Sequence, residues 1–162
     1  MPSESGIKRV VVIGIGNALL KDEGVGVHVI QRLENFIPPE GIQLEVVDGG
    51  TSPDICLCFE GVDKLIAIDA AKGNNKPGTI YRFHPDELEY DVGTAISMHQ
   101  AGLLHSLKLL QYLGLSPKQV VIIGIEPKEI DWGLELSDEV AQRVPEVVKF
   151  VQEEIQQVLL PD

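Results

Sequence analysis

The chain lacks the features that define several large protein classes. Its 162 residues include two cysteines, so no disulfide framework is expected. No stretch reaches the roughly 18 consecutive apolar residues of a membrane-spanning helix, and the N-terminal MPSESGIKR has no hydrophobic signal-peptide core. Basic residues are scarce, with 13 Lys and Arg against 25 Asp and Glu, giving a net charge of −12. We therefore expect a cytoplasmic protein that binds neither nucleic acid nor a membrane.

The chain begins like a nucleotide-binding domain and then departs from that pattern. Val10–Ile13 is a β-branched run typical of a buried strand, and the GIG that follows at 14–16 supplies a tight turn. A dinucleotide fingerprint needs a third glycine where Leu19 stands. The loop then carries Asp22 and Glu23, whose negative charges would repel a pyrophosphate. A nucleotide-binding domain is therefore only an alternative here.

Strand and helix patterns alternate along the whole chain, without repeats or linkers. The predicted strands are Lys8–Ile15, Ile42–Val47, Lys64–Ile68, Thr79–Phe83 and Gln119–Ile125. The predicted helices are Gly24–Phe36, Ser52–Glu60, Ser97–Leu113 and Asp138–Leu159, with Ser137 as the N-cap of the last and Pro145 as a break or kink in it. We predict one three-layer α/β/α domain over 1–162, with a twisted, mostly parallel five-stranded sheet and a flexible segment at 1–7.

The carboxyl ends of the predicted strands, and the loop before the third helix, carry most of the chemically useful side chains. These are Asn17, Asp22, Glu23, Asp48, Asp69, His99 and Glu126. In parallel sheets such residues meet at one edge. Crowded carboxylates need a cation or hydrogen-bond donors, and Glu, Asp and His together suit a divalent transition metal. Each residue also has a structural alternative, because acids favour helix starts and turns and a histidine can begin a helix.

Five segments together resemble the nickel–iron hydrogenase maturation endopeptidases. They are GIGNALLKDEGVG, VVDGGTSP, LIAIDAAKGNNKPGTIYRF, SMHQAGLLHSL and VVIIGIEPKEIDWGLELS, in the family's order and over nearly the whole chain. The resemblance implies a mostly parallel sheet between helices. It also implies an endopeptidase whose partner is the hydrogenase large-subunit precursor, from which it removes a C-terminal extension after nickel insertion.

The same resemblance assigns site residues. It places the metal ligands, which are also the expected catalytic residues, at Glu23, Asp69 and His99, each from a different loop. It implies substrate binding by Asn17, Asp48, Gly49, Gly50 and Thr51. The expected cofactor is a divalent metal, nickel first, held by the enzyme or supplied by the substrate. Three ligands leave coordination positions open for a water or a substrate atom.

Other catalytic patterns are weaker, and some roles stay open. The sequence has no HExxH, and no Ser–His–Asp or Cys–His arrangement is convincing. Cys56 and Cys58 are expected to pack as small apolar residues, with nickel transfer as a minor alternative. Trp132 either anchors a partner or forms a lid over the core. A maturation chaperone that binds the precursor without cutting it is the second functional alternative, and we expect a monomer or weak oligomer.

Overall fold

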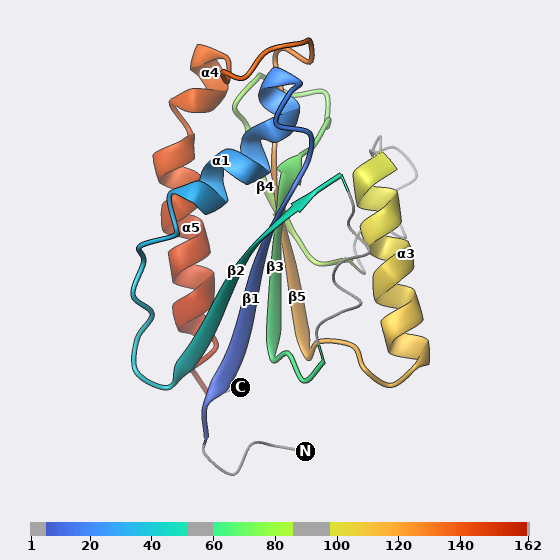
Figure 1. The fold of residues 1–162 in the computed structure, drawn as a ribbon, viewed down its shortest axis with the longest axis vertical. Coiled ribbons are helices and arrows are strands. Elements are labelled where there is room, and N and C mark those ends of the chain that lie inside the picture. Colours follow the sequence, from blue (N-terminus) through green and yellow to red (C-terminus); the bar gives the residue numbers. More distant parts are fainter. Residues whose placement is uncertain (1–5, 52–59, 86–97, 162) are drawn as a thin grey trace.

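The computed structural model describes residues 6–51, 60–85 and 98–161, with residues 98–102 described by their backbone alone. It is a five-stranded sheet with helices on both faces (Figure 1). The strands are β1 (Lys8–Ile15), β2 (Ile42–Gly50), β3 (Lys64–Ala70), β4 (Ile80–Phe83) and β5 (Gln119–Ile125). The helices are the 3-10 turn η1 (Lys21–Gly24), α1 (Val25–Gln31), α3 (Met98–Tyr112), α4 (Asp138–Ala141) and α5 (Val144–Gln157).

The strand order creates a switch point in the middle of the sheet. The order is β2-β1-β3-β5-β4, with β4 antiparallel to β5 and the other neighbours parallel. From β1 the chain moves to one side to form β2 and then returns to the other side to form β3. In open α/β sheets, ligands bind outside the carboxyl ends of the strands where the order reverses in this way. The ends of β1 and β3 are therefore the first place to look for a site.

Alternating residues of the central strands face two separate cores. On one face Val10, Val12, Ile66 and Ile68 pack in a core with Val29 of α1 and Val147 of α5. On the other face Val11, Ile13, Leu65 and Ala67 pack in a core with Leu103 and Leu107 of α3. Burial on both faces explains the continuous apolar runs of β1 and β3. The predicted three-layer fold with a mostly parallel five-stranded sheet is confirmed, with α1 and α5 on one face and α3 on the other (Figure 1).

Two strands are longer than predicted, and this changes the setting of two acidic residues. β2 continues through Asp48 to Gly50, and β3 continues through Asp69 to Ala70. Each extension pairs with a neighbouring strand; Asp69 lies opposite Gly124 of β5. The predicted ends at Val47 and Ile68 are therefore wrong. Apolar patterning stops at the first polar residue, whereas the backbone ladder continues for as long as a partner strand is present.

Two helices also differ from the prediction. The helix expected over Gly24–Phe36 begins as η1 and ends at Gln31, after which the chain forms turns. The helix expected over Asp138–Leu159 is divided into α4 and α5, with Pro145 in the first turn of α5. Proline lacks an N–H and clashes with the preceding turn, so the predicted break is confirmed. Most of the helix expected at Ser52–Glu60 lies outside the described residues, as do residues 1–5. Within the described part, no helix has the length and apolarity needed to cross a membrane.

A buried ion pair ties α5 to the sheet at the amino ends of the strands. Lys64 and Glu154 are 3% and 5% exposed. Lys64 Nζ donates to the Glu154 backbone oxygen at 2.8 Å and also to its carboxylate, while Arg82 pairs with the other carboxylate oxygen. Burial alone would raise the pKa of Glu154, but Lys64 and then Arg82 outweigh it and hold the pKa below its usual value near 4.5.

Replacing Glu154 with Gln is expected to destabilise the fold by about 3 kcal/mol, because a buried ammonium then loses its carboxylate. The Glu154 pKa is lower in the folded than in the unfolded chain. Its stabilisation is therefore complete above pH 4.5 and is lost as the pH falls through the folded-state value. Urea denaturation should show a shallower acid dependence for the variant. As a control, Glu146→Gln breaks the exposed pair with Arg143 and should cost less than about 1 kcal/mol. An equal loss of unfolding free energy in the two variants would contradict a stabilising role for the buried Lys64–Glu154 pair.

Candidate active site

Backbone contact brings the turn after β1 onto the end of β3. Gly16 has a φ of +134°, and a Cβ atom there would lie 1.9 Å from the Glu23 carbonyl oxygen and 3.5 Å from Asp69 Oδ1. A Cβ on Gly26 of α1 would lie 2.3 Å from the Ile68 carbonyl oxygen. Only glycine permits both approaches. The Glu23 backbone and the Asp69 carboxylate therefore flank the same residue at the switch point.

Asp69 is held in the interior at this edge. It is 2% exposed, and its Oδ1 accepts a hydrogen bond from the Ala70 N–H at 2.8 Å. Successive strand residues point to opposite faces, and Leu65 and Ala67 belong to the core on the α3 side. Asp69 has the same alternation and so projects toward the face that α3 covers.

His99 lies in the first turn of α3, whose bounds are Met98–Tyr112. In Figure 1, α3 begins near the end of the sheet where β1 and β3 finish, and it runs back toward their starts. This puts the His99 backbone on the face and at the edge that Asp69 also occupies. The His99 side chain lies outside the described part, and no three potential metal ligands form a group among the side chains that are described. The three-ligand site therefore stays a prediction.

The predicted substrate-binding residues border the same glycine turn. The Gly16 N–H donates to the Gly50 carbonyl oxygen at 2.7 Å, which links the turn to the end of β2. Asp48 Oδ1 accepts from the Gly50 N–H at 2.9 Å, and Asp48 and Thr51 are exposed while Gly49 is buried. Asn17 is half-buried, and its Oδ1 accepts from the Leu19 N–H at 2.9 Å, so its carbonyl shapes the turn. These residues therefore lie next to the glycine turn, and their role in substrate binding stays a prediction.

Asp22, next to Glu23 in the sequence, has a different task. It is fully buried, and its carboxylate accepts four hydrogen bonds of 2.7–2.9 Å, all from the segment after β5. The donors are the N–H groups of Lys128, Glu129 and Ser137 and the Ser137 hydroxyl. Ser137 occupies the N-cap position of α4 as predicted, but its hydroxyl binds Asp22 and makes no cap hydrogen bond. Asp22 thus connects the turn after β1 to the loop between β5 and α4.

Glu126, at the end of β5, is also structural. Its Oε1 accepts from the N–H groups of Gly73 and Asn75 and from the Tyr81 hydroxyl, at 2.7–3.0 Å. Burial alone would raise the pKa of Glu126, but these donors, led by Tyr81, outweigh it and hold the pKa below its usual value. The sequence placed Asp22 and Glu126 at the correct edge but could not show their donors, which come from distant segments.

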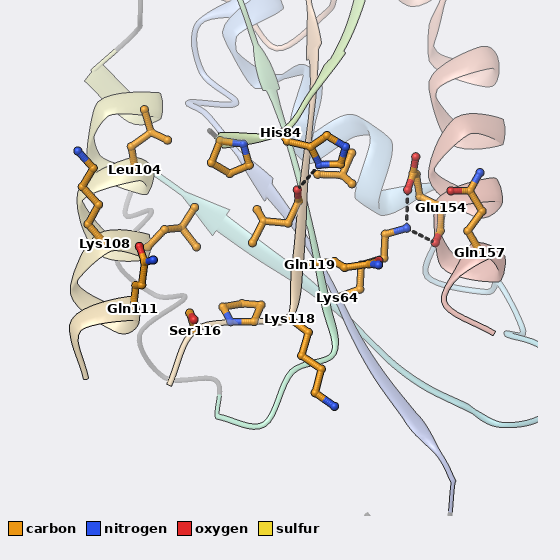
Figure 2. Close-up of a pocket in the computed structure, with 15 residues that line it drawn as sticks. Lys64, His84, Leu104, Lys108, Gln111, Ser116, Lys118, Gln119, Glu154 and Gln157 are labelled. Carbon is orange, nitrogen blue, oxygen red and sulfur yellow. Dashed lines mark hydrogen bonds and ion pairs between the residues drawn. The ribbon is translucent and has the colours of Figure 1, made fainter. Parts of the chain in front are cut away.

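A pocket of about 600 Å³ lies at the other end of the strands, near the amino ends of β3 and β5. Figure 2 shows the Lys64–Glu154 pair inside it and the contact between His84 Nδ1 and the Val120 carbonyl oxygen. Lys118, which also lines it, pairs with Asp63 at 3.1 Å. The buried Lys64–Glu154 pair stabilises the fold here, and the predicted site residues lie at the carboxyl ends of the strands. Cys56 and Cys58 lie outside the described residues.

Comparison with known proteins identifies the family. A family model described as hydrogenase maturation protease matches residues 27–154. The chain belongs to this family. The protease is 32% identical to the hydrogenase 2 maturation protease of Escherichia coli over 154 residues, covering 93% of this chain and 88% of the relative. It is also 32% identical to the hydrogenase expression/formation protein HupD of Bradyrhizobium diazoefficiens, covering 89% and 76% of the two chains.

Solved structures agree with this assignment. The hydrogenase maturating endopeptidase HybD from E. coli superposes with a TM-score of 0.81 at 31% identity, covering 92% of this chain and 93% of that one. The NiFe hydrogenase maturation protease HybD from Thermococcus kodakarensis gives a TM-score of 0.75 at 30% identity, covering 91% and 99%. The predicted family, fold and endopeptidase class are confirmed. The family match includes Asp69 and His99 and begins after Glu23.

Gly16→Ala is expected to cost about 3 kcal/mol of stability, because it adds a Cβ against the Glu23 carbonyl in a backbone conformation that alanine avoids. Gly114→Ala is the matched control. Gly114 also has positive φ, at +73°, but nothing lies within 4 Å of the added atom, so about 1 kcal/mol is expected. Urea denaturation measures both. Equal costs would show that the glycine turn does not need this close approach.

Proposed function

We propose that this protease removes the C-terminal extension of a nickel–iron hydrogenase large-subunit precursor after nickel has been inserted. Family membership supports the protease activity, and a relative of known structure is named for NiFe hydrogenase. The observation that carries the proposal is the placement of the Glu23 backbone and the Asp69 carboxylate beside Gly16 at the switch point of the sheet. This is where an α/β sheet offers groups to a ligand.

The donor set fits a divalent transition metal. Glu23 and Asp69 would supply carboxylate oxygens and His99 an imidazole nitrogen, the ligand types found in catalytic sites with an open position. The fit is supported by the alternation of β3, which aims Asp69 toward the α3 face where the His99 backbone lies. A metal bound there would polarise the scissile carbonyl or lower the pKa of an attacking water.

The chain's own groups hold the ligands and receive the substrate. The Ala70 N–H orients the Asp69 carboxylate, and the glycine turn fixes the backbone of Glu23 against it. The segment Asp48–Thr51 borders this turn through the hydrogen bond between Gly16 and Gly50, so an extended peptide could lie along the edge of β2. Among the strands of the described residues β2 is an edge strand, so one side of its backbone has no strand neighbour there and fits such a peptide.

The nickel that matters is, in this proposal, the substrate's own. Three ligands do not close a coordination sphere, so the site can meet a metal that the precursor already holds through other groups. Glu23 and His99 would then recognise a loaded precursor, and cleavage would follow correct nickel insertion.

Glu23→Gln and His99→Ala are each expected to lower the rate of precursor shortening by more than about 100-fold, because loss of even an outer partner of a metal site costs 10–100-fold. Mass spectrometry of nickel-loaded precursor measures the shortening. Glu34→Gln, an exposed acid after α1, is the matched control and should cut normally. Urea denaturation should place all three variants near the parent protein in stability. Undiminished cutting by both site variants would overturn the assignment of the ligands.

Nickel-loaded precursor should be shortened, and nickel-free precursor should stay intact on incubation with the same protease. Free nickel added to the protease should not restore cutting of the nickel-free precursor, since the metal must be in the substrate. Equal cutting of both precursors would reject the substrate-nickel proposal and leave the protease activity standing. Binding of both without cutting of either would favour a non-cleaving chaperone.

A further inference from the structure

The loop between β5 and α4 exposes several large apolar side chains. Trp132 is 75% exposed, so the prediction of a lid over the core is wrong. Ile130 and Leu134 of the same loop and Leu19 of the turn after β1 are exposed as well. We call these four residues, Leu19, Ile130, Trp132 and Leu134, the apolar loop surface. An ordered group of apolar side chains in water is typical of an interaction site.

Hydrogen bonds hold the loop between β5 and α4 against the turn after β1. Asp22 binds both ends of the loop through Lys128, Glu129 and Ser137, as described above. Gly133 donates to the Leu19 carbonyl oxygen at 2.9 Å and accepts from the Lys21 N–H at 2.9 Å. These bonds place Leu19 beside the Trp132–Leu134 segment. These bonds hold the loop backbone in the conformation that exposes Ile130, Trp132 and Leu134.

The same bonds connect the apolar loop surface to the candidate active site. Asp22 and Glu23 are adjacent in η1, so the residue that clamps the loop is followed directly by a predicted metal ligand. In Figure 1 the loop from β5 to α4 lies at the end of the molecule where β1 and β3 finish. A partner seated on this surface is therefore held at a fixed distance from the site.

Charge around the surface indicates the kind of partner. The flanking acids outnumber the bases; they are Glu129, Asp131, Glu135, Asp138 and Glu139, against Lys21 and Lys128. A second copy of this chain would bring the same acids and a further net charge of −12, which disfavours self-association here. The surface fits a different protein, with an apolar hollow bordered by basic side chains.

We propose that the apolar loop surface docks the folded body of the hydrogenase precursor, with Trp132 as the central anchor, while the extension enters the site. This inference rests on the proposed function for the identity of the partner. It assigns recognition of the body to the β5–α4 loop and leaves the chemistry to the switch point. Exposed tryptophans are frequent anchors of this kind because one side chain buries a large apolar area.

The test compares Trp132→Ala with Tyr112→Ala. Tyr112 is an aromatic residue 88% exposed at the far end of α3, which makes it a matched control. With nickel-loaded precursor, Trp132→Ala should raise KM about tenfold or more, as loss of an interface anchor does, and leave kcat nearly unchanged. Tyr112→Ala should alter neither. An unchanged KM for Trp132→Ala, with normal cutting by the parent protein, would overturn the docking surface and leave the proposed function intact.

A second measurement separates docking from cleavage. Trp132 is the sole tryptophan of the chain, so 5-fluorotryptophan labelling gives one fluorine resonance. That resonance should shift when nickel-loaded precursor is added, whether or not cutting occurs. A shift without cutting would support the surface and reject the proposed cleavage of this precursor. If cutting occurs and the resonance does not shift, the precursor does not bind this surface. If the resonance shifts only with the concentration of this protein, a second copy of the chain and not the precursor binds there.

Discussion

The site depends on a close approach of backbone to backbone between the turn after β1, the start of α1 and the end of β3. A Cβ atom on Gly14 would lie 2.4 Å from the Gly26 carbonyl oxygen, and the contacts at Gly16 and Gly26 are as tight. Side chains at these positions would push η1 away from the sheet. Glu23 would then move away from Asp69, and the loop that Asp22 binds would move with it. Three glycines thus set the geometry of both the candidate ligands and the apolar loop surface.

The carboxylates of this acidic chain are distinguished by what surrounds them. Asp22 and Glu126 each accept three or more hydrogen bonds from neutral donors, and Glu154 faces two cations. Such partners satisfy the carboxylate oxygens without a metal. The Glu23 backbone carbonyl and the Asp69 carboxylate both lie next to Gly16 at the switch point. The donors and cations from other segments, and not residue type, mark Asp22, Glu126 and Glu154 as structural acids.

The two ends of the strands have different roles. At the amino ends of the strands, Lys64, Glu154 and Arg82 connect β3, α5 and β4 through buried charges. At the carboxyl ends lie the glycine turn, the Asp48–Thr51 segment and the apolar loop surface. The Lys64–Glu154–Arg82 cluster therefore lies far enough from the candidate site that one can be altered with limited effect on the other. This separation makes site variants informative, because they need not unfold the protein.

Much of the fold could be predicted from the sequence, because the signals are local. β-branched runs defined β1 and β5 at their observed bounds, and Pro145 marked the break between α4 and α5. The motifs around Glu23, Asp69 and His99 pointed to the family and to one edge of the sheet. The ends of β2 and β3 were missed because pairing with a neighbour, and not apolarity, decides where a strand stops.

The sequence by itself determined the order of the elements, the two-faced burial of the central strands and the residues that reach the carboxyl edge, since these follow from periodicity and composition. Only the tertiary structure decided which acid does what. Asp22 and Glu23 are adjacent and chemically alike, yet Asp22 is buried because its donors come from Ser137, 115 residues away. The exposure of Trp132 was decided in the same way, by bonds from the opening turn that fix its loop. Contacts between distant segments leave no local pattern, so no single stretch of sequence reveals them.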